Sequence, residues 1–105
     1  MTHERVLKMV EEMGLPCAYG HFAEGQSPEP PFLVFLYPES RHFAADGVAY
    51  FKKRKLHLEL YTDYKSVELE ERIETVLESH GLFYARSEVW IESERLYKVL
   101  YEMEV

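Results

Sequence analysis

The order of apolar and polar positions along the chain predicts two helices. Residues 3–13 repeat apolar side chains at helical spacing, with Thr2 as the N-cap and Gly14 as the stop. A second helix is expected over 65–80, where one apolar stripe runs up to Gly81. The stripe consists of Leu69, Ile73, Val76, Leu77 and His80.

Shorter apolar segments predict five strands. A brief strand is expected at 17–19, and the continuous apolar run 32–37 predicts a central strand that is covered on both faces. From 50 to 61 apolar and polar residues alternate, which indicates a long strand with one buried face. The apolar side of that strand carries Leu56, Leu58 and Leu60, and the other side carries Lys55, His57, Glu59 and Tyr61.

The chain closes in a predicted hairpin around the turn 92–94. In its first strand, residues Phe83, Ala85, Ser87, Val89 and Ile91 share one face, and in its second strand Tyr97, Val99, Tyr101, Met103 and Val105 do so. Two loops are expected, at 21–31 and 38–47, because both segments are rich in turn-forming residues. The order αβββαββ predicts a single α+β domain over 1–105, with two helices packed on a mostly antiparallel sheet.

Length and charge narrow the class of protein. A chain of 105 residues fits one domain. The formal net charge of −7 argues against binding nucleic acid mainly through phosphate contacts. Cys17 is the single cysteine, so neither an intramolecular disulfide nor a cysteine-rich metal site can form. The longest apolar run, 32–37, is too short to span a bilayer, and we expect the protein to act first in a reducing cytoplasm.

The sequence offers little catalytic chemistry. Of the five histidines, no two have the spacing of metal ligands on a helix, and only His57 and Glu59 share a strand face. Cys17 lies in an apolar strand, and no nucleophile elbow, P-loop or dinucleotide fingerprint is present. We therefore expect no enzyme activity, no cofactor and no metal site.

Two charge features invite a functional interpretation. The basic run 52–55 opens the long strand, and the second helix carries Glu68, Glu70, Glu71, Glu74 and Glu78 on its expected exposed side. Lysines on a strand edge commonly block aggregation. Alternatively, the basic run contacts the acidic helix of another copy, and such head-to-tail contacts close into rings when the rotation allows it. The long loop 21–31 is either an interaction arm or a plain connector.

A series of short motifs covers nearly the whole chain. They are Gly14-Leu15-Pro16, Tyr19-Gly20-His21-Phe22, Pro30 to Val34, Phe43 to Asp46, Tyr50, Leu56 to Tyr61, Glu71 to Gly81, Tyr84 to Glu88 and Ile91 to Glu94. In order and spacing these motifs resemble a family of small proteins from long-tailed phages and Gram-positive prophages, found among head–tail joining and tail genes. None of the motifs contains a catalytic group.

The resemblance implies a structural virion protein, either a tail terminator or a neighbouring head-completion protein. Such terminators form a six-membered ring on the finished tail tube, stop its polymerisation and offer a surface to the head connector. The implied partners are other copies of the chain, the tail tube protein and connector proteins, with no sequence-specific nucleic acid and no membrane. The implied location is the host cytoplasm during assembly and then the tail–head junction. The alternative is a regulatory module that binds a host protein.

Candidate interface residues follow from these features. They are Phe22, Glu24 and Gln26 in the first loop, Phe43 and Asp46 in the second, Lys53 and Lys55 on the strand, and Glu68, Glu70 and Glu74 on the helix. An acidic ring around a DNA conduit would repel the passing phosphates. We expect the three glutamates to line that conduit.

Overall fold

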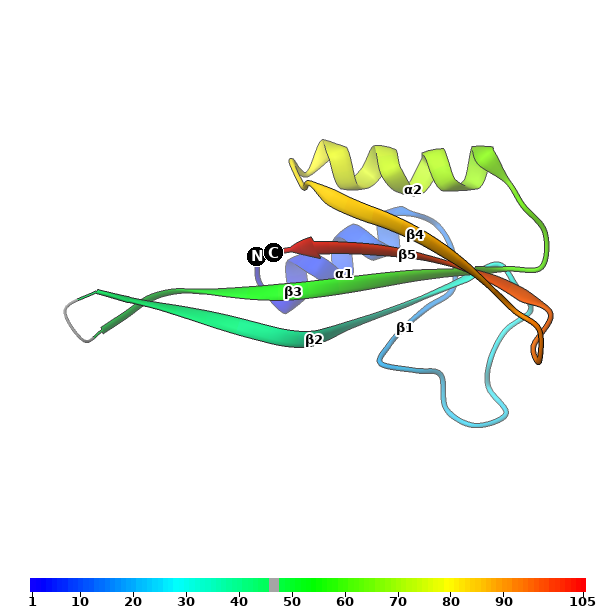
Figure 1. Ribbon diagram of the computed structural model, residues 1–105, viewed down its shortest axis with the longest axis horizontal. Helices are drawn as coiled ribbons and strands as arrows, with labels where there is room; N and C mark the ends of the chain where they lie inside the picture. Colours follow the sequence, from blue (N-terminus) through cyan, green and yellow to red (C-terminus); the bar gives the residue numbers. More distant parts are fainter. Residues whose placement is uncertain (46–47) are drawn as a thin grey trace.

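Seven elements, in the predicted order, make up the part of the chain that the computed structural model describes. It describes residues 1–45 and 48–105, with the side chains of 40–53 left out. The elements are α1 (His3–Glu12), β1 (Cys17–Tyr19), β2 (Phe32–Ala45), β3 (Val48–Thr62), α2 (Val67–Ser79), β4 (Tyr84–Ile91) and β5 (Leu96–Glu104). The strands form one sheet in the order β1-β2-β3-β5-β4, in which only β1 and β2 pair in parallel (Figure 1).

Side-chain caps fix the N-termini of both helices, and a glycine follows each C-terminus. The hydroxyl of Thr2 accepts a hydrogen bond from the Arg5 amide at 3.2 Å, and Ser66 caps α2 in the same way. Gly14 and Gly81 follow the helices with φ of 76° and 72°, a conformation that side chains disfavour. The predicted boundaries of the two helices are therefore confirmed to within a residue or two.

The core lies between the two helices and one face of the sheet. Leu56, Leu58 and Leu60 of β3 are buried there, as predicted. The other core residues are Val6, Met9, Val10, Met13, Leu33, Phe35, Ile73, Leu77, Val99, Tyr101 and Met103. Burial of this apolar area is the main stabilising term of the fold.

The opposite face of the sheet is covered at one end by the loop between β1 and β2. The rings of Phe22 and Phe32 meet edge-on, with centroids 5.3 Å apart, and Val34 is buried beside them. The run 32–37 is therefore covered on both faces at its start, as its two-sided apolar pattern predicts. Leu36, further along, is only half-buried.

The predicted common face of the strand 83–91 is not a core face. Ala85, Ser87 and Val89 lie on the open side of the sheet and are exposed. Tyr84 lies on the opposite side of β4 and packs against Tyr101, with ring centroids 5.4 Å apart. The difference arises because the helices cover only one face of this mostly antiparallel sheet, and the other face can remain in solvent.

The expected loop at 38–47 is wrong. β2 continues as a strand through Ala45 and pairs with β3 along the way. The register changes between Leu36↔His57 and Glu39↔Lys55, so two residues of β2 oppose one residue of β3. This is a β-bulge, and it accommodates Pro38 at a position where the ladder requires no amide donor. Of the predicted turn at 45–47, residues 46–47 lie outside the described residues.

Candidate functional site

The paired strands β2 and β3 project beyond the rest of the sheet (Figure 1). β1 pairs with β2 only as far as Phe35, and β5 pairs with β3 only from Lys55 onward. Beyond the bulge, the described residues 39–45 and 48–54 form strand pairs only with each other. We call the described residues 39–45 and 48–55 the arm. The arm lies along the longest dimension of the molecule, which measures 51 Å.

The base of the arm is fixed to both ends of the chain. The Arg54 guanidinium lies 4.2 Å from the centroid of the Tyr37 ring and donates to the Met1 carbonyl oxygen at 3.1 Å. The Tyr37 hydroxyl is hydrogen-bonded to Nδ1 of His3 at 2.8 Å. Backbone hydrogen bonds of 3.2 and 2.9 Å join Arg54 to Val105. These contacts set the direction in which the arm leaves the body.

Charge is divided unevenly between the arm and the body. Residues 39–55 contain five lysines and arginines but only two acidic residues. The other 88 residues contain seven basic and seventeen acidic residues. Lys55, at the base, pairs with Glu39 across the two strands, with Nζ 3.6 Å from Oε1. The arm is thus a basic projection on an acidic domain.

The acidic face of α2 is partly neutralised inside the molecule. Arg86 of β4 contacts Glu70 at 2.5 Å and lies 4.0 Å from Glu74. Lys65 pairs with Glu70 at 2.8 Å and also with Glu88. The hydrogen bond from Lys65, followed by its charge, lowers the pKa of the Glu88 carboxyl.

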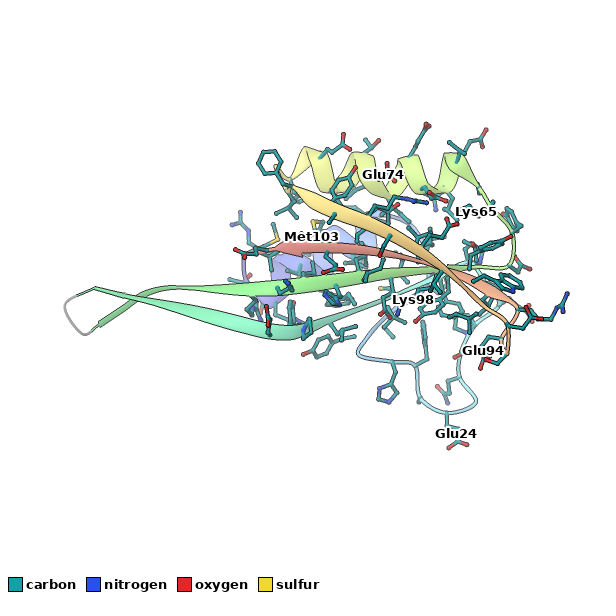
Figure 2. All side chains as sticks on the ribbon, viewed as in Figure 1. Glu24, Lys65, Glu74, Glu94, Lys98 and Met103 are labelled. Atoms are coloured by element: carbon teal, nitrogen blue, oxygen red, sulfur yellow. The ribbon has the colours of Figure 1, made fainter. Side chains whose placement is uncertain are left out.

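The predicted placement of Glu70 and Glu74 on the exposed side of α2 is therefore wrong, whereas Glu68 is exposed as expected. Both carboxylates face the sheet, and Glu74 accepts a hydrogen bond from the Tyr101 hydroxyl at 2.8 Å. Burial, and then this hydrogen bond, raise the pKa of Tyr101. In Figure 2, Glu74 is seen on α2 above β4. Helical periodicity placed Glu70 and Glu74 outside the apolar stripe of α2. Their carboxylates nevertheless lie toward the sheet, because Arg86 pairs with both of them and Lys65 pairs with Glu70.

The other predicted interface residues fall into two separate groups. Phe22 is half-buried in the β1–β2 loop, where Glu24 and Gln26 are exposed, and Figure 2 shows Glu24 pointing away from the sheet. Phe43 and Lys53 lie on the arm, where their backbones pair with Phe51 and Arg41. Asp46 lies outside the described residues, and the side chains of Phe43 and Lys53 are not described. The structure therefore joins Phe43, Lys53 and Lys55 on the arm and leaves the loop residues apart.

Sequence reasoning missed one prominent side chain, Phe83. This ring is 94% exposed directly before β4, and it borders two open hollows of about 510 and 620 Å³. The alternation placed Phe83 on one face of the strand 83–91 together with Ala85, Ser87, Val89 and Ile91, without indicating that it is exposed. The one local signal is its place in the short connection between the helix stop Gly81 and the strand β4.

Reactive groups are few in the described part of the chain. His57 Nε2 is buried without a hydrogen-bond partner there and lies 3.5 Å from Glu102 Oε2. Burial, and then the charge of Glu11, raise the pKa of the Cys17 thiol, which disfavours the reactive thiolate. Among the described residues, no three side chains of the metal-binding types lie together, and no helix is long and apolar enough to cross a membrane.

No protein-family model matches the sequence, and no curated protein matches it either. Function is therefore inferred from the arm, the free strand edges and the distribution of charge and exposed apolar side chains.

Proposed function

We propose that this protein is a structural subunit of a long-tailed phage or prophage particle. In this proposal, copies form a ring on the end of the tail tube, stop its growth and join it to the head connector. The single observation that carries the proposal is the basic two-stranded arm projecting from an acidic body. Such an arm is suited to binding other protein subunits.

The arm favours assembly for a physical reason. A two-stranded ribbon without a third strand is at best marginally stable in water, so a partner that adds to it is favourable. The arm and the acidic body are different surfaces of one molecule, and their contact in a second copy is head-to-tail. Contacts of that type close into rings when the rotation between subunits permits it.

A ring that stops the growth of a polymer needs two different faces, and it does not need to make or break covalent bonds. One face of the ring must match the tube end, and the other must accept the connector while rejecting further tube subunits. An acidic lumen would keep the DNA phosphates from binding as they pass. Glu68 and Glu71 are exposed and available for that purpose, whereas Glu70 and Glu74 are engaged with Arg86 and cannot supply free negative charge.

The test is genetic and uses the inducible phage or prophage that carries this reading frame. The frame is disrupted, lysates are examined by negative-stain electron microscopy, and the wild-type gene is supplied in trans as the rescue. A second rescue uses the arm variant Lys52→Glu/Lys53→Glu. Its matched control is Arg5→Glu/Lys8→Glu, which makes the same charge change on exposed positions of α1.

Overlong tails beside detached, DNA-filled heads are the expected result. The wild-type gene and the α1 control should restore normal particles, and the arm variant should not. Leaking heads with tails of normal length would instead assign the protein to head completion, which is the second candidate. Intact virions of normal length would contradict both structural roles and favour a module that binds a host protein.

A further inference from the structure

The strand β4 forms one edge of the sheet, and its face away from α2 carries no charged side chain. Its two charged residues, Arg86 and Glu88, lie on the α2 side and pair there. β5 is its neighbour on one side, and no strand of the described chain lies on the other. Edge strands in monomeric proteins are usually blunted by charge, proline or shortness. Here Val89 and Trp90 of β4 are 50% and 40% exposed, and Phe83, the residue before the strand, is 94% exposed. This combination is typical of an edge that receives a partner.

The charge around this edge is opposite to that of the arm. Residues 68–91, which span most of α2 and all of β4, contain six acidic and two basic residues. One of the two basic residues, Arg86, is already engaged with Glu70 and Glu88. Glu68, Glu71 and Glu78 are exposed on α2, which Figure 1 shows running beside β4. A basic strand added to β4 would therefore meet an acidic helix.

The lengths of the free edges also agree. Each described arm strand, 39–45 and 48–54, has seven residues, and β4 has eight. Among the described residues, the arm strands have no further strand neighbour beyond the base, so both partners present unpaired backbone groups. In Figure 1 the arm leaves one end of the sheet, whereas β4 lies along its side. The arm therefore meets the β4 edge of another copy and not of its own chain.

We propose that the arm of one copy pairs with the free edge of β4 in a second copy and extends its sheet. This inference rests on the proposed function, because it names the contact that builds the ring. The contact covers Phe83 and Val89, satisfies free backbone donors and acceptors on both sides, and joins opposite charges. Because it uses two different surfaces, each copy has one arm to give and one edge to offer.

The experiment blocks each surface separately in the purified full-length protein. The edge variant is Phe83→Lys/Val89→Lys. Its matched control is Tyr64→Lys/Val67→Lys, which introduces the same two positive charges at exposed apolar positions away from the edge. The arm variant is Lys52→Glu/Lys53→Glu, with Arg5→Glu/Lys8→Glu as its control. Circular dichroism and melting curves establish that every variant is folded.

Sedimentation velocity then measures assembly up to about 1 mM, where a contact with a dissociation constant of about 1 mM is roughly two-fifths occupied. Wild type and both controls should form oligomers larger than dimers. Each blocked variant alone should remain monomeric. An equimolar mixture of the two blocked variants should form a heterodimer and nothing larger, because only one intact arm and one intact edge remain to meet.

Three outcomes would overturn the inference. They are a wild-type protein that stays monomeric over this range, an edge variant that assembles like wild type, and blocked variants that form no heterodimer on mixing. None of these depends on a phage. The inference can therefore hold while the tail phenotype fails, and the tail phenotype can be found while this contact is refuted.

Discussion

The hydrogen bond between Tyr101 and Glu74 is the most direct test of how α2 is held on the sheet. Tyr101 is fully buried, and its hydroxyl donates to Glu74 Oε2 at 2.8 Å. Replacing Tyr101 with phenylalanine keeps the ring packing against Tyr84 and removes only the hydroxyl. Glu74 then loses its buried donor and keeps Arg86 at 4.0 Å.

The size of the effect follows from the charge and exposure of the acceptor. A hydrogen bond to a charged group contributes about 1.5–3 kcal/mol to stability. The Glu74 side chain is 25% exposed, so water replaces part of the lost bond. We therefore expect Tyr101→Phe to lower the free energy of unfolding by about 1–2 kcal/mol, or the melting temperature by roughly 4–12 °C.

Urea unfolding followed by circular dichroism at neutral pH measures this change. Tyr64→Phe is the matched control, because Tyr64 is 57% exposed and should tolerate the loss of its hydroxyl. In a double-mutant cycle with Glu74→Gln, the coupling energy should be about 1 kcal/mol. A Tyr101→Phe variant within about 0.3 kcal/mol of wild type would refute the internal role of Glu74 and return its carboxylate to solvent.

Further predictions address the core, the helix stop and two ionisable groups. Leu58→Ala, at a fully buried position, should cost about 2–5 kcal/mol in urea unfolding. Gly14→Ala should cost about 1 kcal/mol in the same assay, because φ is 76° there. The pKa of Glu88 is lowered in the fold, so its contribution, under about 1 kcal/mol, is present above pH ~4.3 and is lost as pH falls through the folded value. Glu88→Gln should therefore be less stable than wild type at neutral pH and equal to it in acid. A hydrogen bond to Glu78, and then burial, raise the pKa of Tyr84 to about 12. Its contribution is thus present below pH ~10 and is lost as pH rises through the folded value, and Tyr84→Phe should flatten the alkaline unfolding curve.

Much of the fold could be read from local sequence. The helices followed from apolar spacing together with Thr2, Gly14 and Gly81, because caps and stops act within a few residues. The faces of β3 and β5 followed from strict alternation, because one side of each is buried against the helices. The strand order and the single parallel pair between β1 and β2 could not be read from these patterns, since they depend on which strands meet.

The first strand of the arm, residues 39–45, was hidden for a related reason, whereas the strand predicted over 50–61 includes much of the second. Residues 39–45 show no alternation of apolar and polar side chains, and Pro38 looked like the start of a loop. In the structure Pro38 falls at a bulge, and the strand continues to Ala45. The basic run 52–55 was visible in the sequence, but its position on a projecting arm was not.

The features of the candidate site can be separated in the same way into those that the sequence determines and those that depend on the tertiary structure. Sequence alone determined that the chain is acidic, has one cysteine and concentrates basic residues between 39 and 55. Only the tertiary structure decided that Glu70 and Glu74 turn toward Arg86, and that Phe83 stands exposed beside a free edge. Periodicity records which side of an element is apolar. Which polar groups pair with each other, and which strand lies at the edge of the sheet, depends on residues that are distant in sequence and are brought together by folding.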